Sequence, residues 1–391
     1  MALIARLALV LTTPPMLSDD IWRYIHDGAM FSKGVNPYQY APNEFSPEQL
    51  PVPQIAERIN NPELVTIYQP VSQLIYVGLE RAWSWCPGWW QKYDLDHDKL
   101  FRLGFVLFDM LLIVLILVWL REAGRSAWWA VTYAWHPLAI SEVAGSGHQD
   151  VIGIAFLVAS LWLAWRLRQE VSERFSRYRR LMAVIAGVCF GLALGVKPIV
   201  LPIALVLAWM LRKKPAIILY AAIATVITLL LIYLPFLFMD GGLTRLMETG
   251  ENFIRRWAFN GSVYPLMNRM IKKPWLDGLV LLILLATLCR VTQQEKDNPA
   301  RPAGVYLYAS LLLSSTVHPW YLLWCLALVP MWFSLSFWVF TLTVTASYAA
   351  HLYDGYRVPG WVVVAQYIPV YALLAYELWM RNRSRTGLKT L

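Results

Sequence analysis

The amino-acid sequence predicts an all-α polytopic membrane protein, and its composition supplies the main evidence. Hydrophobic residues make up 58% of the 391 residues and charged residues only 15%, and the chain contains 20 Trp and 20 Tyr. So few charges cannot cover the surface of a globular protein of this size. The composition therefore argues against a soluble enzyme, a disordered regulator and a nucleic-acid-binding domain.

Twelve segments approach the length of about 20 mostly apolar residues that a membrane-spanning helix needs. We predict spans at 2–17, 99–120, 126–142, 150–166, 181–197, 198–211, 216–237, 275–290, 303–317, 319–333, 335–353 and 360–380. The first is interpreted as an uncleaved span, because one Arg precedes the apolar run and no A-x-A cleavage pattern follows it. No repeat or linker divides the chain, so residues 1–391 are expected to form one domain.

The positive charges predict the orientation. Short loops at 121–125, 166–180, 212–214 and 289–302, with the tail 381–389, hold 18 of the 34 basic residues and fall on one side of the alternating spans. By the positive-inside rule this side is cytoplasmic, and both termini with it. This bias also accounts for most of the net charge of +9. The long segments 18–98 and 238–274 then face outward, towards the periplasm if the membrane is a bacterial inner membrane.

Residues 67–86 resemble a further span, but counting them as one would place the basic loops outside. Their apolar residues follow helical spacing on one face: Val71, Leu74, Ile75, Leu79, Ala82 and Trp83. We therefore predict an interfacial helix on the outer leaflet, anchored by Trp83 and Trp85.

The ionisable residues are distributed unequally between the two sides. All six histidines map to the outer face or the outer half of a span: His26, His97, His136, His148, His318 and His351. Asp19, Asp20, Asp27, Glu142 and Asp150 do the same. Because such groups are costly at membrane depth, their clustering predicts an outward-facing polar cavity, although any one of them can simply be a solvated loop residue. The four cysteines show no metal-ligand spacing, and no metal site is predicted.

The most specific segment is SDDIWRYIHDGAMFSKGVNPYQYAP, residues 18–42. Asp19 and Asp20 follow the first span and begin a predicted helix, where Asp19 alone is also explained by capping. On that helix Asp20, Tyr24 and Asp27 share one face, and Tyr24 and Asp27 are candidates for substrate binding. A carboxylate near a low-dielectric boundary has a raised proton affinity and suits general-base chemistry.

This segment, followed by NPELVTIYQPVSQLIY, resembles the first external loop of membrane glycosyltransferases of the C superfamily (GT-C). It is most similar to bacterial polyprenol-phosphate mannosyltransferases related to the catalytic subunit of the GPI mannosyltransferase. Three later segments fit the same pattern in order: HPLAISEVAGSGHQD (136–150), LGVKPIVLPIAL (194–205) and STVHPWYLLW (315–324). Each is weak alone, and the combination is fairly specific.

The resemblance implies a GT-C-like fold, a sugar donor on a polyprenyl phosphate, and a catalytic Asp in the external loop. Aligned on D-x-x-x-Y, Asp20 takes the catalytic place and Asp19 is its neighbour. Some relatives have D-x-D where this chain has S-D-D beginning at Ser18. No cofactor is therefore assigned, and a divalent cation stays open.

Three further residues are candidates for substrate binding. His148 and Asp150 border the cavity in GSGHQD, although Asp150 also suits the cap of the next span. Lys197 is the one basic residue of a long apolar stretch. It is interpreted as an anion site, with snorkelling towards the interface as the alternative.

Arg255 and Arg256 form an adjacent pair on the predicted outer face and suit a phosphate, either that of the donor or that of lipid headgroups. His318 is placed in the site, and Trp324 in the interfacial aromatic belt. Asp109 lies in the middle of a span and is interpreted as a buried contact between helices.

These observations predict an inverting sugar transfer at the outer face, from the lipid-linked donor to a lipid or glycan acceptor, with Asp20 as general base. Mannose is implied by the resemblance alone. A transporter or flippase is the main alternative, although no paired broken helices indicate inverted repeats. A polysaccharide ligase or polymerase would share the donor chemistry. No ATP- or NAD-binding motif occurs, so an activated lipid-linked donor or an ion gradient must supply the energy.

Overall fold

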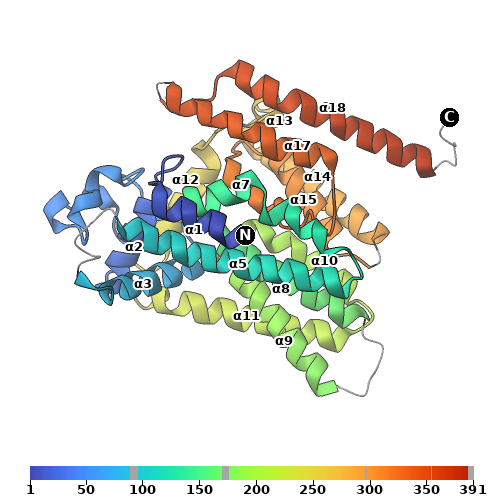
Figure 1. Cartoon of the computed structure of the whole chain (residues 1–391), viewed down its shortest axis with the longest axis horizontal. Helices are drawn as coiled ribbons and strands as arrows, with labels where there is room; N and C mark the ends of the chain where they lie inside the picture. Colours follow the sequence, from blue (N-terminus) through green and yellow to red (C-terminus); the bar gives the residue numbers. More distant parts are fainter. Residues whose placement is uncertain (89–95, 170–175, 296, 354, 386–391) are drawn as a thin grey trace.

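The computed structural model describes residues 1–88, 96–169, 176–295, 297–353 and 355–385 (Figure 1). In this part of the chain the regular elements are helices, and β pairing is confined to isolated bridges from Phe259 and Asn260 to Thr316. The all-α fold class is therefore confirmed.

Six helical stretches of the described residues are long and apolar enough to cross a membrane. They are α5 (His97–Glu122), α8 (Asp150–Gln169), α11 (Pro215–Leu237), α14 (Lys273–Gln294), the stretch Leu335–Leu352, and the part Gly360–Arg383 of α18. Helix α18 itself extends over Gly360–Arg385. The stretch Leu335–Leu352 joins α17 (Leu335–Thr343) to a 3-10 segment. The structure thus supports a polytopic membrane protein, while the count of twelve spans is not confirmed.

The other predicted spans are shorter, are interrupted or, in the case of α9 (Ser176–Leu194), begin with several arginines. Three of them correspond to α1 (Ala2–Thr12), α9 (Ser176–Leu194) and α15 (Ala300–Leu312), and 198–211 corresponds to a 3-10 segment followed by α10 (Ala204–Met210). Residues 126–142 break into short turns that include α6 (Val131–Ala134) and α7 (Pro137–Ile140), and 319–333 contains only α16 (Leu323–Leu326) and 3-10 or irregular turns. Both interruptions contain a proline, Pro137 or Pro319, which cannot donate a helical hydrogen bond.

Helix α8 forms the centre of the bundle. It packs against α5 on one side and α9 on another, and α9 packs in turn along α11. Helices α17 and α18 pair with each other along the opposite edge of the molecule (Figure 1). The end of α8 that begins at Asp150 points towards the part of the molecule that contains the first long segment.

The first long segment folds around α2 (Asp20–Ser32) and α3 (Pro70–Ser84), which pack against each other and against α5. Gly28 permits this close crossing, because a Cβ there would lie 2.8 Å from the carbonyl oxygen of Tyr76. Between the helices, buried Asp27 accepts hydrogen bonds from Arg23 (3.0 Å) and Gln73 (3.1 Å). These contacts hold α2 and α3 together where they pack against α5.

The helix predicted within 67–86 is therefore present as α3. Its buried face differs from the predicted one, because it includes polar Gln73 while Leu74 is exposed. Trp83 stacks on the ring of His97 at 4.6 Å, whereas Trp85 is 84% exposed. The position of α3 on the outer leaflet stays a prediction.

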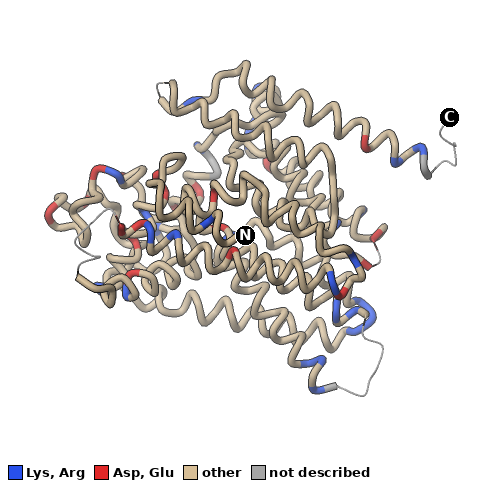
Figure 2. Tube along the Cα trace, in the orientation of Figure 1, with Lys and Arg blue, Asp and Glu red and all other residues tan. Residues whose placement is uncertain are grey.

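Lys and Arg gather at the end of the molecule opposite the first long segment, with a few Asp and Glu beside them, whereas the two signs of charge are mixed near that segment (Figure 2). This asymmetry has the form that the positive-inside rule requires. Which end faces the cytoplasm stays a prediction.

Buried charges are paired between helices. Arg6 of α1 contacts Asp109 of α5, both side chains are fully buried, and the Tyr133 hydroxyl donates to Asp109 at 2.8 Å. The interpretation of Asp109 as a helix–helix contact is thus confirmed.

We expect Asp109→Asn to lower the free energy of unfolding by about 3–5 kcal/mol, because it leaves the Arg6 guanidinium buried without its counter-charge. The double variant Arg6→Met with Asp109→Leu should recover most of this loss. Thermal unfolding in detergent measures both, and a double variant less stable than Asp109→Asn would contradict the explanation.

Candidate active site

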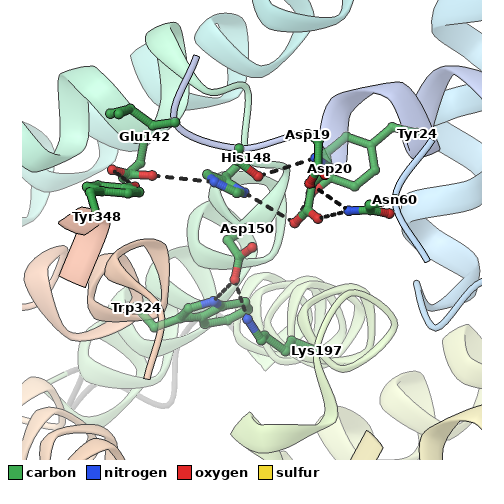
Figure 3. A network of polar contacts seen from close by, with 12 residues as sticks. Asp19, Asp20, Tyr24, Asn60, Glu142, His148, Asp150, Lys197, Trp324 and Tyr348 are labelled. Atoms are coloured by element: carbon green, nitrogen blue, oxygen red, sulfur yellow. Dashed lines mark hydrogen bonds and ion pairs between the residues drawn. The ribbon is translucent and has the colours of Figure 1, made fainter. Parts of the chain in front are cut away.

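Asp20 lies at the first turn of α2, at the edge of a group of polar side chains (Figure 3). Pro14 and Pro15 follow the end of α1, and the backbone N–H of Asp20 donates to Ser18 Oγ at 3.3 Å. These features begin a new helix and place Asp20 where the helix dipole favours a carboxylate.

The Asp20 carboxylate is nearly enclosed, with 17% of its side chain exposed. The Asn60 amide donates to Asp20 at 2.6 Å and to Asp19 at 3.0 Å, and the Tyr24 hydroxyl lies 3.5 Å from the other Asp20 oxygen. Burial and the adjacent charge of Asp19 raise the pKa of Asp20 to about 6, against the opposing hydrogen bonds of Asn60 and Tyr68. Asp20 is therefore ionised at neutral pH and takes up a proton readily.

The loop from Gly145 to Asp150 brings His148 towards Asp20. Gly147 has a φ of +77°, and a Cβ there would lie 2.6 Å from the Ile21 side chain and 2.9 Å from that of Arg102. Arg102 is fully buried, pairs with Asp98 at 2.6 Å and donates to the carbonyl of Ala144 at 3.2 Å. Arg102, held by Asp98 on α5, thus fixes the backbone of the loop just before His148.

His148 is fully buried between two carboxylates (Figure 3). Its Nδ1 lies 3.7 Å from Asp20 Oδ2, and its Nε2 lies 3.4 Å from Glu142 Oε2. The other Glu142 oxygen accepts a hydrogen bond of 2.6 Å from the Tyr348 hydroxyl. Glu142 belongs to a short π-helical turn, Ser141–Gly145, a form of helix that occurs frequently at functional sites.

Asp150 and Lys197 form a second polar pair beside His148. Lys197 Nζ and the Trp324 indole N–H each lie 2.6 Å from the same Asp150 oxygen, and the ammonium also lies 3.8 Å from the centre of the Tyr321 ring. An ammonium has three donors, and its side chain is 26% exposed. One N–H of Lys197 therefore stays available to an anion.

Five aromatic rings form a continuous stack behind these groups. His148 stacks on Trp320 with 3.8 Å between ring centroids, Trp320 on His318 (4.3 Å), His318 on Phe259 (4.4 Å), and Phe259 on Tyr356 (5.3 Å). Backbone hydrogen bonds join Phe259 to Ser315 (3.0 Å) and Val317 (2.8 Å). They position His318 beside the segment that follows α12 (Thr244–Arg256) and precedes α13 (Val263–Met267).

Both histidines of the stack are neutral. Burial lowers the pKa of His148 well below its usual value, and burial with the nearby Lys197 charge lowers the pKa of His318 to about 3. Nδ1 of His318 and both ring nitrogens of His148 are buried without a hydrogen-bond partner. Buried polar atoms ordinarily have partners, and the described residues contain others without one, among them Arg102 Nε and Ser146 Oγ. These three differ from the others because they lie beside Asp20 and Lys197.

The structure brings together most of the residues that the sequence singles out. Asp19, Asp20, Tyr24, His148, Asp150 and Lys197 share one close-up view (Figure 3), and His318 joins them through Trp320. Asp27 lies farther along α2, in its contacts with Arg23 and Gln73. Arg256 is exposed at the end of α12, and the Arg255 side chain lies outside the described part of the structure.

Sequence reasoning missed Asn60, Trp320 and Tyr348 as members of the site, and it did not pair Glu142 with His148. Asn60 stands next to the NPELVTIYQP segment and Trp320 within HPW, so their motifs were in view. Tyr348 lies in an apolar stretch without any such signal. The assignment of Trp324 to the interfacial belt is wrong, because its side chain is buried and hydrogen-bonded to Asp150.

Within the described residues, no group of three or more His, Cys, Asp and Glu side chains is arranged to hold a metal ion. The Asp19 and Asp20 carboxylates share the Asn60 amide instead.

Comparison with known protein families gives a match over the first half of the chain. A family model described as alpha-(1->6)-mannopyranosyltransferase, N-terminal domain, matches residues 2–213, just over half of the 391 residues. The matched part includes Asp20, Asn60, Glu142, His148 and Lys197, whereas His318, Trp320 and Tyr348 follow it. Neither the search of curated proteins nor that of solved structures found a match.

We expect Gly147→Ala to destabilise the protein by more than the roughly 1–2 kcal/mol that a left-handed backbone costs a non-glycine residue, because its Cβ also meets Ile21 and Arg102. Gly124→Ala is the matched control, since Gly124 has a similar φ of +65° and no atoms within 4 Å of the added Cβ. Equal losses in thermal unfolding would contradict the predicted clash.

Proposed function

Because the chain belongs to the alpha-(1->6)-mannopyranosyltransferase family, and is thus a mannosyltransferase, we propose that it takes mannose from a polyprenyl-phosphate donor. The acceptor is a lipid or a glycan, and transfer occurs at the outer face of the membrane. The observation that carries this proposal is the nearly enclosed Asp20 carboxylate, with its raised pKa, in one polar group with Lys197.

Asp20 acts as the general base of an inverting displacement. It takes the proton of an acceptor hydroxyl while that oxygen attacks the anomeric carbon of the sugar. The bond from this carbon to the phosphate oxygen breaks, and its electron pair leaves with the lipid phosphate. A base with a pKa of about 6 is ionised at neutral pH and still basic enough for this step.

Lys197 and His318 stabilise the charge that develops on the phosphate. Lys197 offers its free N–H, and His318, which is neutral, offers an N–H rather than a charge. Such preorganised donors are most effective in a site that excludes water. Arg255 and Arg256 remain candidates for the same phosphate or for lipid headgroups, because both belong to α12, which lies within the second long segment.

The same arrangement supports the proposed location of the site. Asp20 and His148 lie at the end of the bundle that contains the first long segment, away from the basic end. With the basic end cytoplasmic, the site faces the periplasm of a bacterial inner membrane, and both termini are cytoplasmic. The family match favours this enzyme over a transporter or flippase.

We expect Asp20→Asn to lower mannose transfer at least 10²-fold, in the order of magnitude of general-base catalysis, because the amide cannot accept the proton. Purified protein in proteoliposomes, with radiolabelled polyprenyl-phosphate-mannose and membrane acceptors, measures the product. Asp240→Asn, at an exposed position, is the matched control and should retain transfer. A folded Asp20→Asn variant as active as the wild type would remove Asp20 from the mechanism.

The pH dependence should report the Asp20 carboxylate. Wild-type kcat/KM should rise with pH and reach half its plateau near pH 6, because the protonated acid is inactive as a base. Asp19→Asn should move this limb to lower pH, since the Asp19 charge raises the pKa of Asp20. A limb that stays in place in Asp19→Asn would show that another group titrates.

A further inference from the structure

Behind Asp20, on the side away from the Asn60 amide, a buried row of polar atoms continues for three residues. Asp20 Oδ2 faces His148 Nδ1 at 3.7 Å, His148 Nε2 faces Glu142 Oε2 at 3.4 Å, and Glu142 Oε1 accepts from Tyr348 at 2.6 Å. The row joins α2, the π-helical turn with its loop, and the 3-10 segment Val344–Leu352. Asp20 has 17% of its side chain exposed, whereas the side chains of His148 and Glu142 are fully buried.

Proton donors and acceptors can alternate along this row. If the proton of neutral His148 is on Nε2, it faces the Glu142 carboxylate at 3.4 Å, and Nδ1 then has a lone pair. That lone pair faces Asp20, which has no proton to donate until it acts as a base. The absence of hydrogen bonds at both His148 nitrogens is explained if the row tightens only when Asp20 is protonated.

We infer that His148 and Glu142 form a proton-accepting pair behind Asp20, which stabilises the protonated base during sugar transfer. The inference rests on the proposed function. The proton leaves the acceptor oxygen for Asp20, and the new O–H of Asp20 donates to His148 Nδ1. Transfer of that proton to Nδ1, with release of the Nε2 proton to Glu142, gives the same net charge. The proton returns to solvent through Asp20 after the products leave.

His148 and Glu142 are therefore positioning residues that act through Asp20. Other ionisable groups also face this row and contribute to its titration. Asp19, Tyr24 and Tyr68 lie beside Asp20, and the Asp150 charge acts on both Asp20 and Glu142. Lys197 and His318 lie near His148, and Tyr348 and Tyr356 interact with each other and with the Asp20 and Glu142 charges. The Glu142 charge acts on Tyr348 and Tyr356, whereas His148 is neutral and His148→Gln removes no charge, so a shift of the pH profile in His148→Gln reports the pair itself.

The first test compares His148→Gln and Glu142→Gln with wild type in the proteoliposome assay. We expect the plateau kcat to fall about 10- to 100-fold with a donor KM within about twofold of wild type, since the base is weakened but the donor is still bound. The acid limb should move to lower pH, because the protonated form of Asp20 loses its hydrogen-bond acceptor. A lower kcat with an unmoved limb would show a structural role and overturn the inference.

The chain offers a matched control for these substitutions. His97 and Glu80 form another histidine–glutamate pair, 2.7 Å apart, which joins α3 to α5. His97→Gln and Glu80→Gln remove the same chemistry and should leave the acid limb in place. A limb that moves equally in these variants would overturn the inference.

A second test separates proton acceptance from the filling of space. In His148→Ala, added imidazole should restore kcat several-fold, whereas pyrazole, a ring of similar size and much weaker basicity, should not. Equal restoration by both rings would overturn the inference. Wild type without mannose transfer would refute the proposed function, whereas active wild type, inactive Asp20→Asn and unaltered pair variants would refute the inference alone.

Discussion

The arrangement of this molecule depends on one constraint, that a charge removed from water needs a partner. Fully buried Arg6 pairs with Asp109, and Arg102 pairs with Asp98 and with the carbonyl groups of the loop before His148. The Arg6–Asp109 pair joins α1 to α5, and Arg102 joins α5 to that loop, so these contacts favour one packing among the many that hydrophobic helices allow. The position of the loop that carries His148 follows from the contacts of Arg102, whereas α2 is positioned by its packing against α3 and α5.

The candidate active site combines a paired buried charge with buried histidine nitrogens that have no partner. Asp150 and Lys197 satisfy each other, yet both His148 nitrogens and His318 Nδ1 have no hydrogen bond. Arg6 Nη2 and Arg102 Nε are also without a hydrogen-bond partner, so the histidine atoms are singled out by their position beside Asp20 and Lys197. The neutral state of both histidines suits this position, because hydrogen-bond donors can be provided without adding charge to a buried site.

Sequence reasoning predicted the fold class and most of the polar cluster, but not the helix boundaries or the partners. Asp20, His148, Asp150 and Lys197 were recognisable from local motifs and from their cost in an apolar environment. Trp324 was misplaced, because an indole suits an interfacial belt and a buried hydrogen bond equally well until its acceptor is known. The two broken spans were missed because hydropathy measures composition, not continuity of the helix.

The sequence by itself determined that the chain is helical and suited to a membrane, since these properties follow from composition and from the length of the apolar segments. Tertiary structure decided which groups meet: Tyr348 reaches Glu142 across 206 positions, and Trp324 reaches Asp150 across 174. Local sequence carries no record of such distances, because they depend on how α8, the π-helical turn and the later helices pack around the paired buried charges.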